Sequence, residues 1–233
     1  MKPIIDMHSH LLPGVDDGCP STEEAVTMLR MYEEQNVEAV VCTPHFGPYM
    51  KHDANITRTF KQLLRVESSV KLYLGNEIFD DGNVLSCVSR KIAFTLAGSD
   101  RILVEFFDYD TLPYIISTIN QIKKSRWVPV IAHPERIISL QSRPRFYDSL
   151  CRIGAEMQIN AYDISDNTNI GTLLATRYLL NKQLVTYIGS DAHGATRRPP
   201  MLQNGVKWIY RNLPEEYADA VVHDNAAKII GGA

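Results

Sequence analysis

Two histidines near the start of the chain, His8 and His10, have the spacing of metal ligands. They lie at the end of a segment that begins with Ile4 and Ile5, whose apolar character predicts a buried strand. Side chains at positions i and i+2 of a strand point to the same face, so both imidazoles can reach one ion at the strand's C-terminal end. Two structural histidines would show the same pattern, so the hypothesis needs support from the rest of the chain.

Further residues of metal-binding type recur where later strands are predicted to end. The series is His10, His45, Glu77, Glu105, His133 and His193. Its members are 28 to 35 residues apart, except for the last interval of 60 residues, which corresponds to two units. One strand and the helix that follows it take about 30 residues, so these side chains occupy equivalent positions on successive strands. Only the sixth strand, near Asn160, lacks an obvious ligand.

The pattern between these residues predicts strands that alternate with helices. Besides the strand that ends at His10, strands are expected over residues 37–42, 71–78, 101–107, 128–132, 156–160 and 185–189. Helices are expected over residues 22–35, 55–69, 113–125, 145–152 and 170–182, the first with a capping box in which Ser21 caps the backbone and Glu24 reaches back. Residues 79–99 show no recognisable pattern. The alternation predicts one α/β domain over residues 1–233, with parallel strands, right-handed crossovers and a site at the strands' C-terminal ends.

The candidate ligands are more numerous than one ion uses. The full set is His8, His10, Asp16, His45, Glu77, Glu105, His133, Asp191 and His193. Because a zinc-type site takes three or four ligands, the set favours two or three ions with a bridging carboxylate, for which Glu105 is a candidate. Imidazole and carboxylate ligands without thiolate suit manganese, iron or zinc, and the sequence leaves that choice open.

Arginines beside the candidate ligands predict an anionic substrate. Arg136 follows His133 by three residues, and Arg197 and Arg198 follow His193 closely. The guanidinium group presents a planar fork of donors that matches phosphate oxygens. Metals and arginines together favour hydrolysis of a phosphate ester, with the ions activating water and stabilising the transferring group.

Composition excludes several other classes of protein. The formal charge of −3 and the lack of a basic stripe argue against nucleic-acid binding and against a nuclease. Four separated cysteines without a C-x-x-C pair, and the lack of a long apolar stretch, predict a cytoplasmic protein with reduced thiols and no membrane insertion. A thiol phosphatase needs arginine six residues after its cysteine, whereas Ala25, Pro48, Ala93 and Met157 occupy those positions.

Several motifs resemble those of the PHP (polymerase and histidinol phosphatase) superfamily. They are DMHSHLLPGVDDG at 6–18, TPH at 43–45, GNEI at 75–78, VEF at 104–106, AHPER at 132–136, SDAH at 190–193 and RPP at 198–200. The resemblance is closer to its bacterial manganese-dependent protein-tyrosine phosphatases, which regulate capsule and exopolysaccharide synthesis, and it covers nearly the whole chain. The LPGVDDG continuation distinguishes this branch from other members with the same first histidines.

The resemblance implies a fold, an activity and a set of site residues. The fold is a distorted (β/α)7 barrel with a trinuclear centre, and the substrate is phosphotyrosine on the tail of a tyrosine autokinase. The implied ligand groups are His8 and His10 with Glu105 and Asp191, then Glu77 with His133, and then Asp16 with His45 and His193. Arg136 and Arg198 match phosphate-contacting arginines, and Asp16 or a metal-bound water is a candidate for protonating the leaving group. The alternative is a histidinol-phosphate or other small-molecule phosphatase on the same barrel.

Aromatic residues that follow the strand ends are candidates for the mouth of the site. They are Phe46, Tyr49, Tyr109 and Tyr162, and each is as well suited to packing as to lining a pocket for an aromatic ring. The remaining histidines, His52 and His223, fall outside the ligand series and are expected on the surface or in helices.

Overall fold

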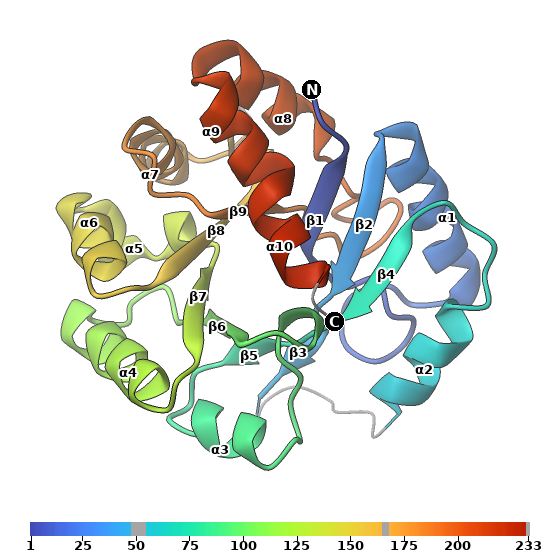
Figure 1. Ribbon diagram of the computed structural model, residues 1–233, viewed down its shortest axis with the longest axis horizontal. Helices are drawn as coiled ribbons and strands as arrows, with labels where there is room; N and C mark the ends of the chain where they lie inside the picture. Colours follow the sequence, from blue (N-terminus) through green and yellow to red (C-terminus); the bar gives the residue numbers. More distant parts are fainter. Residues whose placement is uncertain (48–54, 165–167, 232–233) are drawn as a thin grey trace.

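The computed structural model describes residues 1–47, 55–164 and 168–231, and its strands form a ring surrounded by helices (Figure 1). One sheet has the order β1 (Ile4–Ser9), β2 (Val37–Cys42), β4 (Lys71–Leu74). A second has the order β3 (His45–Phe46), β5 (Glu77–Phe79), β6 (Arg101–Glu105), β7 (Val128–Ala132), β8 (Glu156–Asn160), β9 (Tyr187–Gly189). Every strand pairing is parallel, and a parallel bridge between Ser9 and Ala192 joins β1 to the segment after β9.

Two of the barrel strands are interrupted, which explains why there are two sheets. Only Thr43 and Pro44 separate β2 from β3, and only Gly75 and Asn76 separate β4 from β5, so the described strands occupy seven positions around the ring. The expected continuous strand over 71–78 is therefore wrong at its centre. Pro44 has no N–H to donate, and the buried Asn76 side chain replaces ladder bonds by donating to the Pro44 carbonyl and accepting from the Phe94 N–H, both at 2.8 Å. The barrel is the distorted (β/α)7 form that the resemblance implies.

Helices cover the outside of the ring and also follow its last strand. They are α1 (Thr22–Glu34), α2 (Ile56–Leu63), α3 (Val84–Ser89), α4 (Leu112–Lys124), α5 (Ile138–Gln141), α6 (Arg145–Arg152), α7 (Ile170–Asn181), α8 (Gln203–Asn212), α9 (Glu215–Asp219) and α10 (Asn225–Ile230). Short 3-10 turns lie at η1 (Leu96–Gly98), η2 (Pro134–Arg136) and η3 (Ala161–Ile164), and a π-helical turn, η4 (Ala220–Asp224), joins α9 to α10. The segment 79–99 thus contains α3 and η1.

The start of α1 differs in one respect from the predicted capping box. Ser21 caps the helix as expected, because its side chain accepts the Glu24 N–H at 3.2 Å. The Glu24 carboxylate instead accepts the N–H of Ala195 at 2.8 Å. Glu24 therefore holds α1 against the loop that carries Arg198.

The inside of the barrel is apolar and is closed at one end by the last helix. Alternate residues of β1, Ile5 and Met7, point inward and join a buried cluster with Ile229 and Ile230 of α10, which crosses the centre of the ring in Figure 1. α10 lies at the N-terminal ends of the strands, since Asn225 donates to the carbonyl of Thr186, just before β9. This leaves the opposite end of the barrel, where the strands finish, for a site.

The cysteines and the lengths of the helices concern the expected reduced thiols and the expected lack of membrane insertion. All four cysteines are free thiols. Among the described residues, no helix combines the length and the apolar character needed to cross a membrane. Tyr49 and His52 lie outside the described residues.

Candidate metal centre

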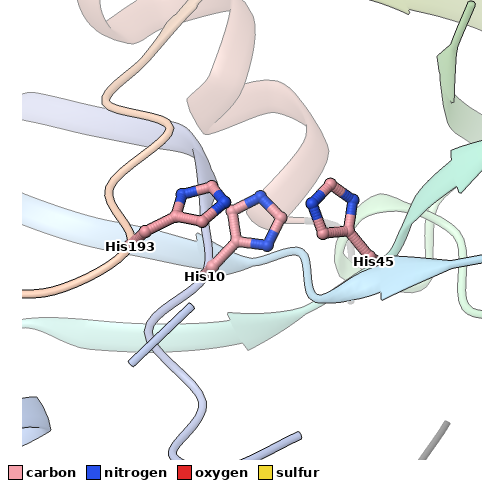
Figure 2. Close-up of side chains that lie close together, drawn as sticks. All are labelled: His10, His45 and His193. Atoms are coloured by element: carbon pink, nitrogen blue, oxygen red, sulfur yellow. The ribbon is translucent and has the colours of Figure 1, made fainter. Parts of the chain in front are cut away.

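Eight of the nine predicted ligands meet at the C-terminal end of the barrel. They fall into four overlapping groups, in each of which the potential ligand atoms lie within 4.8 Å of one another. The groups are His10 with His45 and His193, His8 with His10 and Asp191, His8 with Glu77 and His133, and His45 with Glu77 and Glu105. Figure 2 shows the first group, whose three imidazoles come from different segments and lie side by side.

The strand interruptions place two of these ligands. His45 is the first residue of β3 and Glu77 is the first residue of β5, and the two are partners in the parallel register. In a continuous strand, the backbone hydrogen bonds to the neighbouring strand would run on past this point. Here each strand is instead interrupted just before a candidate ligand. The irregularity of the barrel thus belongs to the construction of the site.

His8 and His10 are held by different partners. Their Nε2 atoms lie 3.2 Å apart, and both side chains are fully buried. His8 Nδ1 contacts Gln158 Oε1 at 2.8 Å, and His10 Nδ1 contacts Asp16 Oδ2 at 2.7 Å. Both partner atoms are acceptors, so each ring keeps a proton on Nδ1, and in the neutral form of the ring the Nε2 lone pair faces the centre, as in metal sites with an outer carboxylate or carbonyl.

Glu77 lies in the middle of the cluster, and one of its carboxylate oxygens has no hydrogen bond from the described residues. Its Oε2 lies 3.2 Å from Nε2 of both His8 and His10 and 2.9 Å from His45 Nδ1, and its Oε1 lies 2.7 Å from His133 Nε2. Glu77 Oε2 and His45 Nδ1 are nevertheless buried without a hydrogen bond from any described residue. A buried carboxylate oxygen and a buried imidazole nitrogen left in this way are costly. A cation bound between them would satisfy both, so the residues fit a metal ion.

The electrostatics of the cluster point to the same conclusion. Burial would raise the pKa of the Glu77 carboxyl, but the surrounding histidines, His8 first, hold it well below its ordinary value. Burial and the negative charge of Glu77 raise the pKa of the Glu105 carboxyl to about 8. The neighbouring imidazoles favour the ionised form of both carboxyls, but at Glu105 burial and the charge of Glu77 outweigh them. A divalent cation stabilises both.

Asp191 connects the ligand cluster to the arginines. Its Oδ1 lies 3.5 Å from His10 Nε2, whereas its Oδ2 accepts from Asn160 Nδ2 at 2.9 Å and from Arg136 Nη1 at 3.1 Å. Arg198 Nη2 also donates to Oδ2. One oxygen thus faces the histidine cluster and the other fixes two guanidinium groups.

Asp16 and Asp17 have different positions. Asp16 is outside the four ligand groups, and its Oδ2 accepts from both His10 Nδ1 and the His45 N–H, at 2.7 and 2.9 Å. Asp17 Oδ1 lies 3.4 Å from His45 Nε2 and 3.8 Å from His193 Nε2. Of the two carboxylates, Asp17 is the one that faces these histidine nitrogens directly.

The cluster opens into a cavity of about 790 Å³. Arg136, Arg198 and Tyr162 line this cavity together with six of the predicted ligands. Arg197 does not, and its exposed side chain lies 3.8 Å from Asp17 Oδ2. Of the other aromatic candidates, Tyr109 is 76% exposed and does not line this cavity, and Phe46 lines a separate, smaller cavity.

His223 is remote from the centre and pairs with Asp224 and Glu38, as expected for a histidine outside the ligand series.

Four residues of the site were not among the predicted ones. Asp17 was not predicted because the adjacent Asp16 was the predicted ligand. The other three, Gln158, Asn160 and Asp163, belong to β8 or to the turn after it, where no ligand was expected. The signal that could have revealed them is Gln158 and Asn160 two apart in an otherwise buried strand.

Comparisons with known proteins identify relatives of this chain. At 30% identity, the chain is similar to the tyrosine-protein phosphatase CpsB of Streptococcus pneumoniae, over 97% of this chain and 98% of that protein. It is 27% identical to the tyrosine-protein phosphatase YwqE of Bacillus subtilis, over 84% of this chain and 79% of that protein.

Solved structures show the same fold. A crystal structure described as that of the metal-dependent tyrosine phosphatases YwqE from B. subtilis and CpsB from S. pneumoniae superimposes with a TM-score of 0.88 at 24% identity, over 98% of this chain and 94% of that one. A D-hydantoinase from Thermus superimposes with a TM-score of 0.63 at 9% identity, over 97% and 70%. Residues 4–231 match the family described as capsular polysaccharide synthesis, CpsB/CapC. The chain belongs to this CpsB/CapC family.

Proposed function

We propose that this protein is a metal-dependent phosphomonoesterase that hydrolyses phosphotyrosine in proteins. One observation carries the proposal. The buried cluster that contains the unsatisfied Glu77 Oε2 opens into the same cavity as Arg136 and Arg198. Cation sites and guanidinium groups that share one cavity suit a phosphate group. The names of the relatives, tyrosine-protein phosphatases, support the choice of ester.

The ions that fit best are two or three Mn²⁺. Iron and zinc are alternatives, because they also bind imidazole and carboxylate ligands. The proximity groups favour one ion between His8, His10 and Asp191, and another near Glu77 and Glu105 with His45 or His133. This differs from the grouping that the resemblance implies, because Glu105 lies with Glu77 and His45 instead of with His8 and His10.

For the third group we propose that Asp17, instead of Asp16, joins His45 and His193. The distances of Asp17 Oδ1 to the two Nε2 atoms support this assignment. Asp16 then has the role of orienting His10, since its Oδ2 is already engaged by that ring and by the His45 N–H.

The chain's own residues account for binding and orientation of the ester. When bound, the ions supply an activated water and positive charge at the phosphoryl group. Arg136 and Arg198 contribute Nη donors to its outer oxygens, and Asp191 keeps both guanidinium groups at the edge of the cluster. A tyrosyl leaving group, with a pKa near ~10, departs more readily than an alkoxide, so it depends less on a proton donor.

The proposed substrate is a phosphotyrosine on the tail of a bacterial tyrosine autokinase, in the cytoplasm. A cavity of about 790 Å³ that includes the half-exposed ring of Tyr162 has room for a phosphotyrosyl side chain. The free thiols are compatible with a reducing compartment. A thiol mechanism finds no support in the lining of the cavity, which includes no cysteine among the described residues.

The test compares two esters with and without manganese. Protein stripped of metal by a chelator is assayed on a phosphotyrosine peptide and on histidinol phosphate, for the wild type, His8→Ala and the control His223→Ala. We expect manganese-dependent phosphate release chiefly from the peptide, lost in His8→Ala and retained in His223→Ala. A preference for histidinol phosphate would assign the site to a small-molecule phosphatase, and folded, metal-loaded protein that hydrolyses neither ester would contradict the proposal.

A further inference from the structure

The strand without a ligand contacts the site through three polar residues. Gln158 Oε1 lies 2.8 Å from His8 Nδ1, Asn160 Nδ2 donates to Asp191 Oδ2 at 2.9 Å, and Asp163, just beyond β8, accepts from Arg136 Nε at 2.8 Å. Each therefore contacts a different functional side chain from behind. Of the three, Asp163 alone holds a residue that the proposed function assigns to the substrate's phosphate.

Asp163 is buried against the base of Arg136. Its side chain is 3% exposed, whereas that of Arg136 is 35% exposed and lines the cavity. The guanidinium group is held at two points, by Asp163 Oδ2 at Nε and by Asp191 Oδ2 at Nη1. Because the group is planar, these two contacts fix its orientation as well as its position.

Fixing an arginine in advance changes how tightly it binds an anion. A free arginine side chain has many rotamers, and their loss on binding opposes the interaction. The buried carboxylate of Asp163 removes most of that freedom before the substrate arrives. Of the five guanidinium hydrogens, it leaves the two on Nη2 and the second one on Nη1 as the donors available to an incoming oxyanion.

We propose that Asp163 is a positioning residue that holds Arg136 ready for the phosphoryl group. The inference rests on the proposed function, because it assumes that Arg136 binds phosphate. It predicts that Asp163 acts through Arg136 alone and leaves the metal ligands unaffected. A merely structural role would instead lower stability or metal content and would be independent of Arg136.

The experiment is a double-mutant cycle on the manganese-loaded protein, with Asp163→Asn, Arg136→Ala and the two combined. The affinity for inorganic phosphate is measured by calorimetry, and kcat and KM are measured on the phosphotyrosine peptide. Asp148→Asn is the matched control, since Asp148 accepts the Tyr178 hydroxyl at 2.6 Å on α6 and does not line the cavity. Thermal unfolding and manganese content are recorded for every variant, and Asp163→Glu tests whether a carboxylate restores the function.

We expect Asp163→Asn to weaken phosphate binding by about 10-fold to 100-fold and to raise KM, with manganese content unchanged. In the Arg136→Ala background the same change should have no further effect, because the residue it positions is gone. Wild-type affinity in Asp163→Asn would overturn the inference, as would full additivity of the two changes or a wild type that does not bind phosphate. If the wild type binds phosphate but hydrolyses no tyrosyl ester, the proposed function fails and the binding cycle still decides the role of Asp163.

Discussion

Two buried or half-buried glutamates at opposite ends of the barrel have contrasting environments. Glu156, at the start of β8, accepts from Arg101 Nη2 at 3.2 Å and from the Tyr187 hydroxyl at 2.7 Å. Glu77, at the other end, is fully buried and has an oxygen without a hydrogen bond from any described residue. The protein gives hydrogen bonds to both oxygens of the first carboxylate, whereas one oxygen of the second has none from the described residues and is open to a cation.

The same contrast applies to the surroundings of each end. α10 closes the N-terminal end with Ile229 and Ile230 against the inner faces of the strands. The C-terminal end gathers histidines and carboxylates around an open cavity. Residues at the closed end should therefore determine stability, and residues at the open end should determine metal binding and activity.

The largest expected effect comes from the centre of the open end. Glu77→Gln keeps the shape of the side chain but removes the charge that two ligand groups share. We expect manganese affinity to fall by more than about 100-fold, beyond the loss typical of outer residues, and activity on the phosphotyrosine peptide to disappear. Calorimetry and phosphate release measure the two effects. Glu156→Gln is the control. Equal losses of manganese affinity and activity in both variants would contradict the proposed difference between the two ends of the barrel.

A smaller effect is expected one layer behind the ligands. Gln158→Met removes the acceptor for His8 Nδ1 while keeping a side chain of similar length. Manganese affinity should fall by about 10-fold to 100-fold, because the ring loses the contact that fixes its tautomer. The exposed Gln121→Met on α4 controls for the substitution itself. Unchanged metal affinity in Gln158→Met would show that β8 does not orient the ligand.

The smallest effect belongs to the closed end. Ile229→Val removes one buried methylene from the cluster beneath the strands and should lower the free energy of unfolding by about 0.5–1.5 kcal/mol. Urea unfolding measures that loss. We expect kcat/KM of the folded protein to stay at the wild-type value, and a clear fall in kcat/KM would indicate that packing of α10 reaches the metal centre.

Several regular elements and the clustering of the candidate ligands followed closely from the sequence, whereas the helix expected over 55–69 ends at Leu63. Strands 37–42, 128–132 and 156–160 and the helix 145–152 have the predicted bounds, because their apolar patterns coincide with burial in the barrel. The clustering of eight candidate ligands was predictable because a parallel barrel brings equivalent strand ends together, whatever the details of each crossover.

Features that depend on three-dimensional partners were not predictable. The break at Gly75 and Asn76 is stabilised by contacts to Pro44 and Phe94, which are distant in sequence. Asp16 and Asp17 are adjacent and chemically identical, so only the direction of each side chain distinguishes them. Glu24 has the right spacing for a capping box, yet a backbone N–H from a distant loop is its partner.

We propose that the buried cluster around Glu77 is a site for several metal ions. The decisive experiment is to titrate metal-free protein with manganese in a calorimeter, with metal content determined independently on the loaded protein. We expect two or three ions per chain in the wild type and fewer in Glu77→Gln. Less than one ion per chain in folded wild-type protein, or the same number in both proteins, would contradict it.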